Sequence, residues 1–139
     1  TAANTAVNIN QTGGSNTAMI NLTGTGNTLT ATQSGGSATL GVRANADSTT
    51  QTISTSGGTN NQVYTNLTGD KGTVNILAVG ASNTITATQS GGGANGHNVG
   101  IDLTGSSNTV TTNQSGSIDT TIGIKSVGSG NTFSITTHN

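Results

Sequence analysis

The side chains that could carry out catalysis or bind a metal are few in this sequence and lie far apart. The acidic residues are four aspartates, at positions 47, 70, 102 and 119, and the only histidines are His97 and His138; cysteine and glutamate are absent. Paired carboxylates need a low-dielectric cleft to separate their pKa values, and zinc or calcium sites need several such ligands together. We therefore expect no catalytic residues, no metal site and no cofactor, and we expect His97 to be a turn or ladder residue.

The composition excludes several other classes of protein. The chain has 139 residues, of which 28% are hydrophobic, 1% aromatic and 5% charged, with 22 Gly, no Pro and a net charge of −1. Ordinary globular domains carry roughly 45–50% apolar and about 25% charged residues. Three basic residues give no electrostatic surface for nucleic acid, and no apolar run approaches the ~20 residues of a transmembrane helix. Such a chain must be ordered by backbone hydrogen bonds and ladders of polar side chains.

The sequence repeats itself about every 11 residues. The clearest copies begin at Asn27, Asn83 and Asn108 and run through alternating Thr and apolar residues to Gln-Ser-Gly, and an earlier copy spans 5–15. A second type of unit ends in Leu-Thr-Gly, at 22–24, 67–69 and 103–105, and looser copies span 38–48, 49–59, 73–82, 120–130 and 131–139. We count about twelve units, or six pairs of about 22 residues, in a single repeat domain over 1–139.

Each unit is predicted to be a short strand followed by a turn. Thr, Val and Ile favour extended structure, and the Gly-rich dipeptides supply the positive φ that a reversal needs. In the clearest unit Leu29, Ala31 and Gln33 share one parity, and the intervening residues are all Thr. One face is therefore apolar with amides at its ends, and the other is mostly Thr.

The charged residues test this assignment of faces independently. Arg43, Asp102 and Lys125 all fall on the parity opposite the apolar residues, and the remaining charges fall in predicted turns. Every charge is outside if the apolar face is inside, which supports the assigned register.

Two architectures suit short strands and tight turns repeated end on end: an up-and-down barrel and a β-solenoid. Strands of a membrane barrel need about 9–11 residues and an apolar outer face, which these units lack. A β-solenoid explains the amides better, because stacked coils place like residues above one another in hydrogen-bonded Asn and Gln ladders. We predict an all-β solenoid of about six coils, with two short strands per coil, that stacks end to end into a cross-β fibre. An irregular coil is expected at 60–82, where neither unit carries Gln at the ladder position.

The pattern Asn-x-apolar-x-apolar/Ala-x-Gln-x-Gly resembles curlin, the subunit of the curli fibres of bacterial biofilms. The best agreement spans Asn27 to Ala44, followed by 83–95 and 108–117. The chain departs from the curlin pattern in using Thr and Asn where curlin units start with Ser, and about a third of its units carry the Gln. The resemblance implies a two-sheet solenoid with internal ladders of Ser, Gln and Asn.

By this resemblance and by parity, two sets of residues are expected inside the solenoid. The internal polar ladder comprises Gln11, Gln33, Gln89, Gln114, Asn16, Asn27, Asn83, Asn108 and Asn131. The internal apolar residues are Val7, Ile9, Ile20, Leu22, Leu29, Leu40, Val42, Ile85, Val99, Ile101, Leu103, Val110, Ile122, Ile124, Phe133 and Ile135.

The predicted function follows from the ends of such a stack. The first unit begins by about Thr5 and the last, still strand-like, runs to Thr137, which leaves little sequence for the polar caps of soluble repeat proteins. Open ends favour head-to-tail addition, which does not close and gives a filament. We expect the polymer interface to comprise Thr5, Val7, Ile9, Phe133, Ile135 and Thr137.

We therefore predict a secreted structural subunit that assembles into amyloid-like extracellular fibres for the biofilm matrix or adhesion, with no enzymatic activity. The first residues, Thr1-Ala2-Ala3, are typical of a mature form whose signal peptide has been removed. The expected partner is the chain itself, and the resemblance also implies a nucleator, an outer-membrane secretion channel and a place at the bacterial cell surface.

An alternative is a monomeric Thr-rich solenoid that binds a ligand, such as an ice-binding protein or an adhesin. Its basis is the outward Thr pairs, for example Thr28 with Thr30 and Thr84 with Thr86. Units 38–48, 96–107 and 120–130 lack a clean pair, and an adhesin that binds carbohydrate would be expected to carry more aromatic side chains.

Overall fold

The computed structural model describes residues 4–23, 26–37, 39–45, 49–57, 59, 61–68 and 71–139, and these form twelve strands. The strands are β1 (Ala6–Gln11), β2 (Thr17–Thr23), β3 (Thr28–Gln33), β4 (Thr39–Asn45), β5 (Thr50–Ser56), β6 (Gln62–Thr68), β7 (Thr73–Val79), β8 (Thr84–Gly91), β9 (Asn98–Thr104), β10 (Thr109–Gly116), β11 (Thr121–Val127) and β12 (Thr132–His138). Among these residues no helix is long and apolar enough to cross a membrane.

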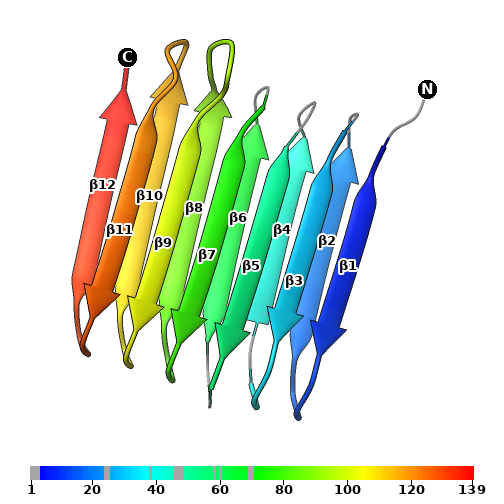
Figure 1. Ribbon diagram of the computed structural model, residues 1–139, viewed down its shortest axis with the longest axis vertical. Helices are drawn as coiled ribbons and strands as arrows, with labels where there is room; N and C mark the ends of the chain where they lie inside the picture. Colours follow the sequence, from blue (N-terminus) through cyan, green and yellow to red (C-terminus); the bar gives the residue numbers. More distant parts are fainter. Residues whose placement is uncertain are drawn as a thin grey trace.

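The strands form two six-stranded parallel sheets, one of the odd-numbered strands and one of the even-numbered strands. We call them the odd sheet and the even sheet. In Figure 1 the odd strands all run one way, the even strands run the other way, and the two chain termini lie at opposite ends of the stack. Because each coil contributes one strand to each sheet, every strand pairs with the strand two places along the chain. The predicted all-β solenoid with two strands per coil is confirmed.

The register between coils is continuous, although the coils differ in length. Thr28 pairs with Ala6, 22 residues earlier, whereas Asn98 pairs with Thr73, 25 residues earlier. The extra residues lie in the loop between β8 and β9, one of the two longer loops in Figure 1. The strands at 60–82 pair in order and without a break in register, like the rest, so the expected irregular coil there is wrong.

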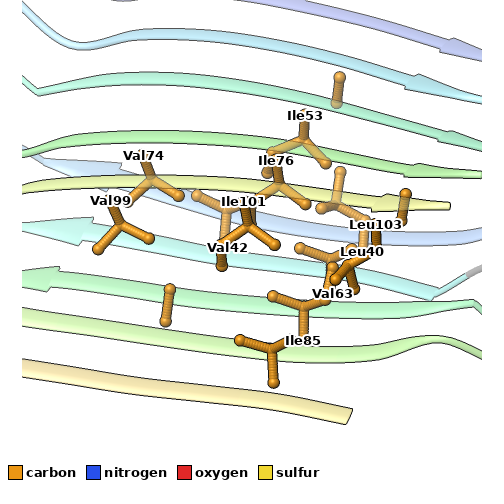
Figure 2. Close-up of a cluster of buried hydrophobic side chains, with 14 of the residues drawn as sticks. Leu40, Val42, Ile53, Val63, Val74, Ile76, Ile85, Val99, Ile101 and Leu103 are labelled. Carbon is orange, nitrogen blue, oxygen red and sulfur yellow. The ribbon is translucent and has the colours of Figure 1, made fainter. Parts of the chain in front are cut away.

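Side chains alternate between the space between the sheets and the outside, as the period of two predicts. In β3 every second residue is buried, and the same alternation recurs in most of the other strands. The buried apolar residues of both sheets form one core along the stack (Figure 2). Leu40, Val63 and Ile85 of the even sheet and Val74, Val99 and Ile101 of the odd sheet contribute to it.

The turns from odd to even strands share a backbone conformation that the sequence requires. In the turn after β9, Gly105 has a φ of 119° and Ser107 a φ of 59°. A Cβ at Gly105 would overlap the carbonyl oxygen of the stacked glycine in the next coil, so only glycine fits there. The stacked turns are also linked, since Ser107 N–H donates to the Ala81 carbonyl at 2.9 Å.

Candidate assembly interface

An asparagine ladder runs along the edge of the solenoid where the even strands begin. The backbone N–H of Asn108 donates to Asn83 Oδ1 at 3.0 Å, and the N–H of Asn131 donates to Asn108 Oδ1 at 3.0 Å. The Asn108 side chain also donates to the Gly128 carbonyl of the next coil at 3.0 Å. Asn83 and Asn108 therefore each bond to the coils on both sides and set their register.

The glutamines form two ladders in different sheets. Gln11 donates to Gln33 at 2.8 Å in the odd sheet, and Gln89 donates to Gln114 at 2.9 Å in the even sheet. At the strand position of these glutamines, the other sheet carries Ala44 or Leu67 in the N-terminal half and Ala78 or Leu103 in the C-terminal half. The amide ladder thus changes sheet midway along the stack, and apolar residues fill the position that it leaves.

Most of the residues expected inside the solenoid are buried. The buried apolar ones are Leu29, Leu40, Val42, Ile85, Val99, Ile101, Leu103, Val110, Ile122 and Ile124. The buried polar ones are Gln33, Gln89, Gln114, Asn27, Asn83 and Asn108. Asn27 lies on the opposite edge from the asparagine ladder, where it accepts a hydrogen bond from Thr49.

The exceptions lie at the two ends of the stack. Val7 is 47% exposed and Ile9 38% exposed, and Gln11 is also exposed, so the expectation that they are internal is wrong for the single chain. They share the inward parity of Leu29, but only one coil covers them. Half-buried for the same reason are Asn16, Ile20, Asn131, Phe133 and Ile135. The Leu22 side chain lies outside the described part of the structure.

The backbone at each end of the odd sheet is left without a neighbouring strand among the described residues, and the two ends match. Ala6 N–H donates to the Asn27 carbonyl at 3.0 Å, so the even-numbered residues of β1 bond to β3 and the odd-numbered ones point to the free edge. Asn98 N–H donates to the Thr120 carbonyl at 2.8 Å, so the odd-numbered residues of β11 likewise point to its free edge. The free N–H and C=O groups at the edge of β11 can therefore pair with the free C=O and N–H groups at the edge of β1 in a second copy.

The same bond recurs at each step and defines how a second copy would continue the stack. The first residue of each odd strand donates to the residue just before the strand it pairs with, as Thr28 does to Thr49 and Thr73 to His97. Continued past β11, this rule directs Thr121 N–H to the Thr5 carbonyl of a second copy. The expected interface residues Thr5 and Thr137 thus lie at opposite ends of the chain: Thr5 directly precedes β1, and Thr137 belongs to β12.

Side chains at the two ends are also complementary under this continued register. In the odd sheet Ile124 would lie next to Ile9 of the second copy. In the even sheet Phe133 would lie next to Ala18, and Ile135 next to Ile20. A large aromatic group thus meets a small side chain, and partly exposed aliphatic groups become covered.

Several buried polar residues are absent from the two sets expected inside the solenoid. Gln51 is buried at a position that is apolar in the neighbouring strands, and Thr65 of the facing sheet donates to its Oε1 at 2.8 Å. The unit 49–59 matches the repeat only loosely, so Gln51 is not assigned to the interior from the sequence, although its parity within the strand indicates an inward position. His97 is buried, where the backbone N–H of Thr120 donates to Nδ1 at 3.3 Å and Nε2 lies 3.2 Å from the Ser90 carbonyl. It occupies a corner of the solenoid, as expected for a turn or ladder residue.

Asp119 joins the two longer loops. Its Oδ1 accepts from the backbone N–H of Gly93 at 2.7 Å and of Gly96 at 2.8 Å, and its Oδ2 accepts from the Asn95 N–H at 3.0 Å. These bonds favour the carboxylate, the one from Asn95 most, and they lower the pKa of Asp119 against the opposing effect of its partial desolvation. Asp119 therefore fixes one loop to the next. Among the described residues no three His, Cys or acidic side chains cluster as metal ligands.

Comparison with known families agrees with this geometry. Residues 3–35 match the family model of the curlin associated repeat. The match covers β1, β2 and β3, and it confirms over this segment the resemblance to curlin. The curlin repeat and the solenoid fold are structural rather than enzymatic. No curated protein and no solved structure matches the chain.

Proposed function

We propose that this chain is a structural subunit that adds head to tail to copies of itself and so builds an amyloid-like fibre. The observation that carries the proposal is the match between the two ends of the solenoid. The free backbone groups have the same parity, the strands would remain parallel, and the partly exposed side chains of one end lie in register with those of the other. Such a contact is heterologous and does not close, so it continues into a filament.

The curlin repeat supports the setting of this assembly. Curli subunits are secreted and form extracellular fibres of the biofilm matrix, and we propose the same setting for this chain. A nucleator and an outer-membrane secretion channel are the further partners that we propose for this setting. The amide ladders suit a fibre, because rows of side-chain amides hydrogen-bonded between stacked coils stabilise such an assembly. The asparagine ladder already links Asn61, Asn83, Asn108 and Asn131 along one edge of the subunit.

The first experiment is electron microscopy of the purified chain after quiescent incubation in dilute buffer, followed by X-ray diffraction of aligned material. We expect long unbranched filaments whose strands lie across the filament axis, with a reflection near ~4.8 Å along that axis. Particles that remain monomeric for days, with the strand content of the folded chain, would contradict the proposal.

No observation favours the alternative of a monomeric ice-binding protein. The outward Thr residues of β8 and β10 form a patch, but Gly41, Arg43 and Tyr64 occupy the outer face of the same sheet in earlier coils. On the odd sheet, Gly100 and Asp102 replace Thr in the later coils. A flat Thr array therefore does not extend along either face.

A further inference from the structure

The outer face of the odd sheet carries a hollow in its C-terminal half. Gly100 and Gly123 are paired neighbours at outward positions of β9 and β11, and a Cβ placed on either would meet no other atom within 4 Å. The hollow above them has a volume of about 700 Å³, and Leu77, Asp102 and Lys125 lie on its rim. We call this surface the glycine pit.

Exposed apolar side chains lie on the same face as the glycine pit. Leu77 is 43% exposed and Val127 75% exposed, and Val79 is exposed as well, although most outward residues of this solenoid are Thr, Ser or Asn. The three apolar side chains belong to β7 and β11, the strands on either side of β9. One surface therefore offers both a recess and the apolar groups that could fill it.

Charge on the rim is mixed in a way that suits contact between identical surfaces. Asp102 and Lys125 are neighbours in paired strands, with Oδ2 and Nζ 3.9 Å apart, and both remain partly exposed. A surface of one sign repels its own copy, whereas a surface with an acid next to a base can turn so that unlike charges meet.

We propose that the glycine pit binds a second copy of this chain side by side, so that filaments pair laterally through the outer faces of their odd sheets. The inference rests on the proposed filament. There the register places Asn8 of the next copy beyond Gly123, so the pit is bounded by Asn75 and Asn8 and recurs once per copy. A weak contact repeated along two filaments gives strong lateral attachment through multivalency.

The test fills the pit without disturbing the fold. Gly100→Thr combined with Gly123→Thr places Thr where β3 and β5 already carry it, and neither glycine has a positive φ. Leu77→Thr removes the main apolar side chain of the rim. Met19→Thr is the matched control, because Met19 is 59% exposed at an outward position of the even sheet. The fraction of paired filaments is measured by electron microscopy, and elongation by seeded growth.

We expect the pit-filling and Leu77 variants to elongate like the unsubstituted chain but to remain single filaments, and the Met19 variant to pair normally. Unchanged pairing in the pit variants, or equal loss in the Met19 variant, would overturn the assignment of the surface. Filaments of the unsubstituted chain that never pair would overturn the lateral contact and leave the proposed function standing. Absence of filaments altogether would overturn both.

Discussion

The head-to-tail contact can be divided into its two halves by one substitution at each end. Ile9→Lys places a charge on the inward side of β1, and Ile135→Lys places one on the inward side of β12. In the single chain Ile9 is 38% exposed and Ile135 is half-buried, so the lysine stem can stay on the apolar surface while its ammonium reaches water. Both variants should therefore fold as monomers.

In the filament the same positions are covered by a second copy, and the ammonium loses its route to water. An unpaired buried charge costs several kcal/mol. At about 4 kcal/mol, with each 1.4 kcal/mol worth a factor of ten, the contact weakens about a thousandfold. Micromolar chain that assembles readily without the substitution would then stay monomeric.

The informative sample is an equal mixture of the two variants. The Ile9→Lys chain retains an intact C-terminal end, and the Ile135→Lys chain retains an intact N-terminal end, so the two can form one contact. The outer ends of that pair both carry lysine, and growth stops. We expect each variant alone to sediment as a monomer and the mixture to sediment as a one-to-one dimer, measured by analytical ultracentrifugation.

The controls place the same charge on the same strands but on the outward side. Asn8→Lys and Ser134→Lys lie next to the test positions at exposed sites, and both should still form filaments. Filaments from either test variant alone would refute the assignment of the ends. Dimers from one variant alone would refute the polarity, because they would require an end that binds its own kind.

Three further predictions concern the subunit and are measured by urea unfolding in the monomeric Ile9→Lys background. Gln33→Lys buries a charge in the amide ladder and should cost several kcal/mol, whereas Thr30→Lys on the outer face should change stability by less than about 0.5 kcal/mol; equal effects would refute the assignment of faces. Gly105→Ala should cost at least about 2 kcal/mol, because the added Cβ meets a carbonyl oxygen of the next coil and the backbone has a positive φ; a neutral effect would exclude the stacked turn. Asp119 has a lowered pKa, so its contribution to stability is complete above the ordinary pKa of 3.8 and is lost as the pH falls through the lower pKa of the folded chain. Below about pH 4 the chain with Asp119 should therefore lose stability, whereas the Asp119→Asn variant, which lacks that contribution at neutral pH, should not. Parallel plots of stability against pH for the two chains would contradict this.

The sequence predicts the fold well because the information that defines a coil is local. In the unit from Asn27 to Gln33, a period of two separates apolar from Thr positions, and the following glycines mark the turn. A strand with one buried face has little freedom in its register, since a shift by one residue exposes its apolar side chains. Alternation and turn residues therefore suffice for the strand order and for most of the buried residues.

What the sequence does not give is how neighbouring coils change the environment of identical units. Val7 and Leu29 have equivalent places in their strands, yet one is exposed and the other buried because only one has a coil on each side. Gln33 and Gln89 end similar units but lie in different sheets, because Gln33 belongs to the odd-numbered strand β3 and Gln89 to the even-numbered strand β8. Such differences depend on position in the stack, which no single unit encodes.

The same dependence on position makes the two ends unlike each other. This explains why the contact should join an N-terminal end to a C-terminal end and not two ends of the same kind. Head to tail, Phe133 meets Ala18, so a large side chain is next to a small one. Two C-terminal ends in contact would bring large side chains of β12 together and overpack the interface, which is unfavourable. Two N-terminal ends in contact would leave a void beside Ala18, which is also unfavourable. The polar side chains also favour head-to-tail contact. Gln11 donates its side-chain N–H to Gln33, so its Oε1 can accept from the Ser126 hydroxyl of the preceding copy in the continued register. The oxygen of that hydroxyl already accepts from Asn131 of its own chain. A filament built in this way has one direction, and its two ends should grow at different rates.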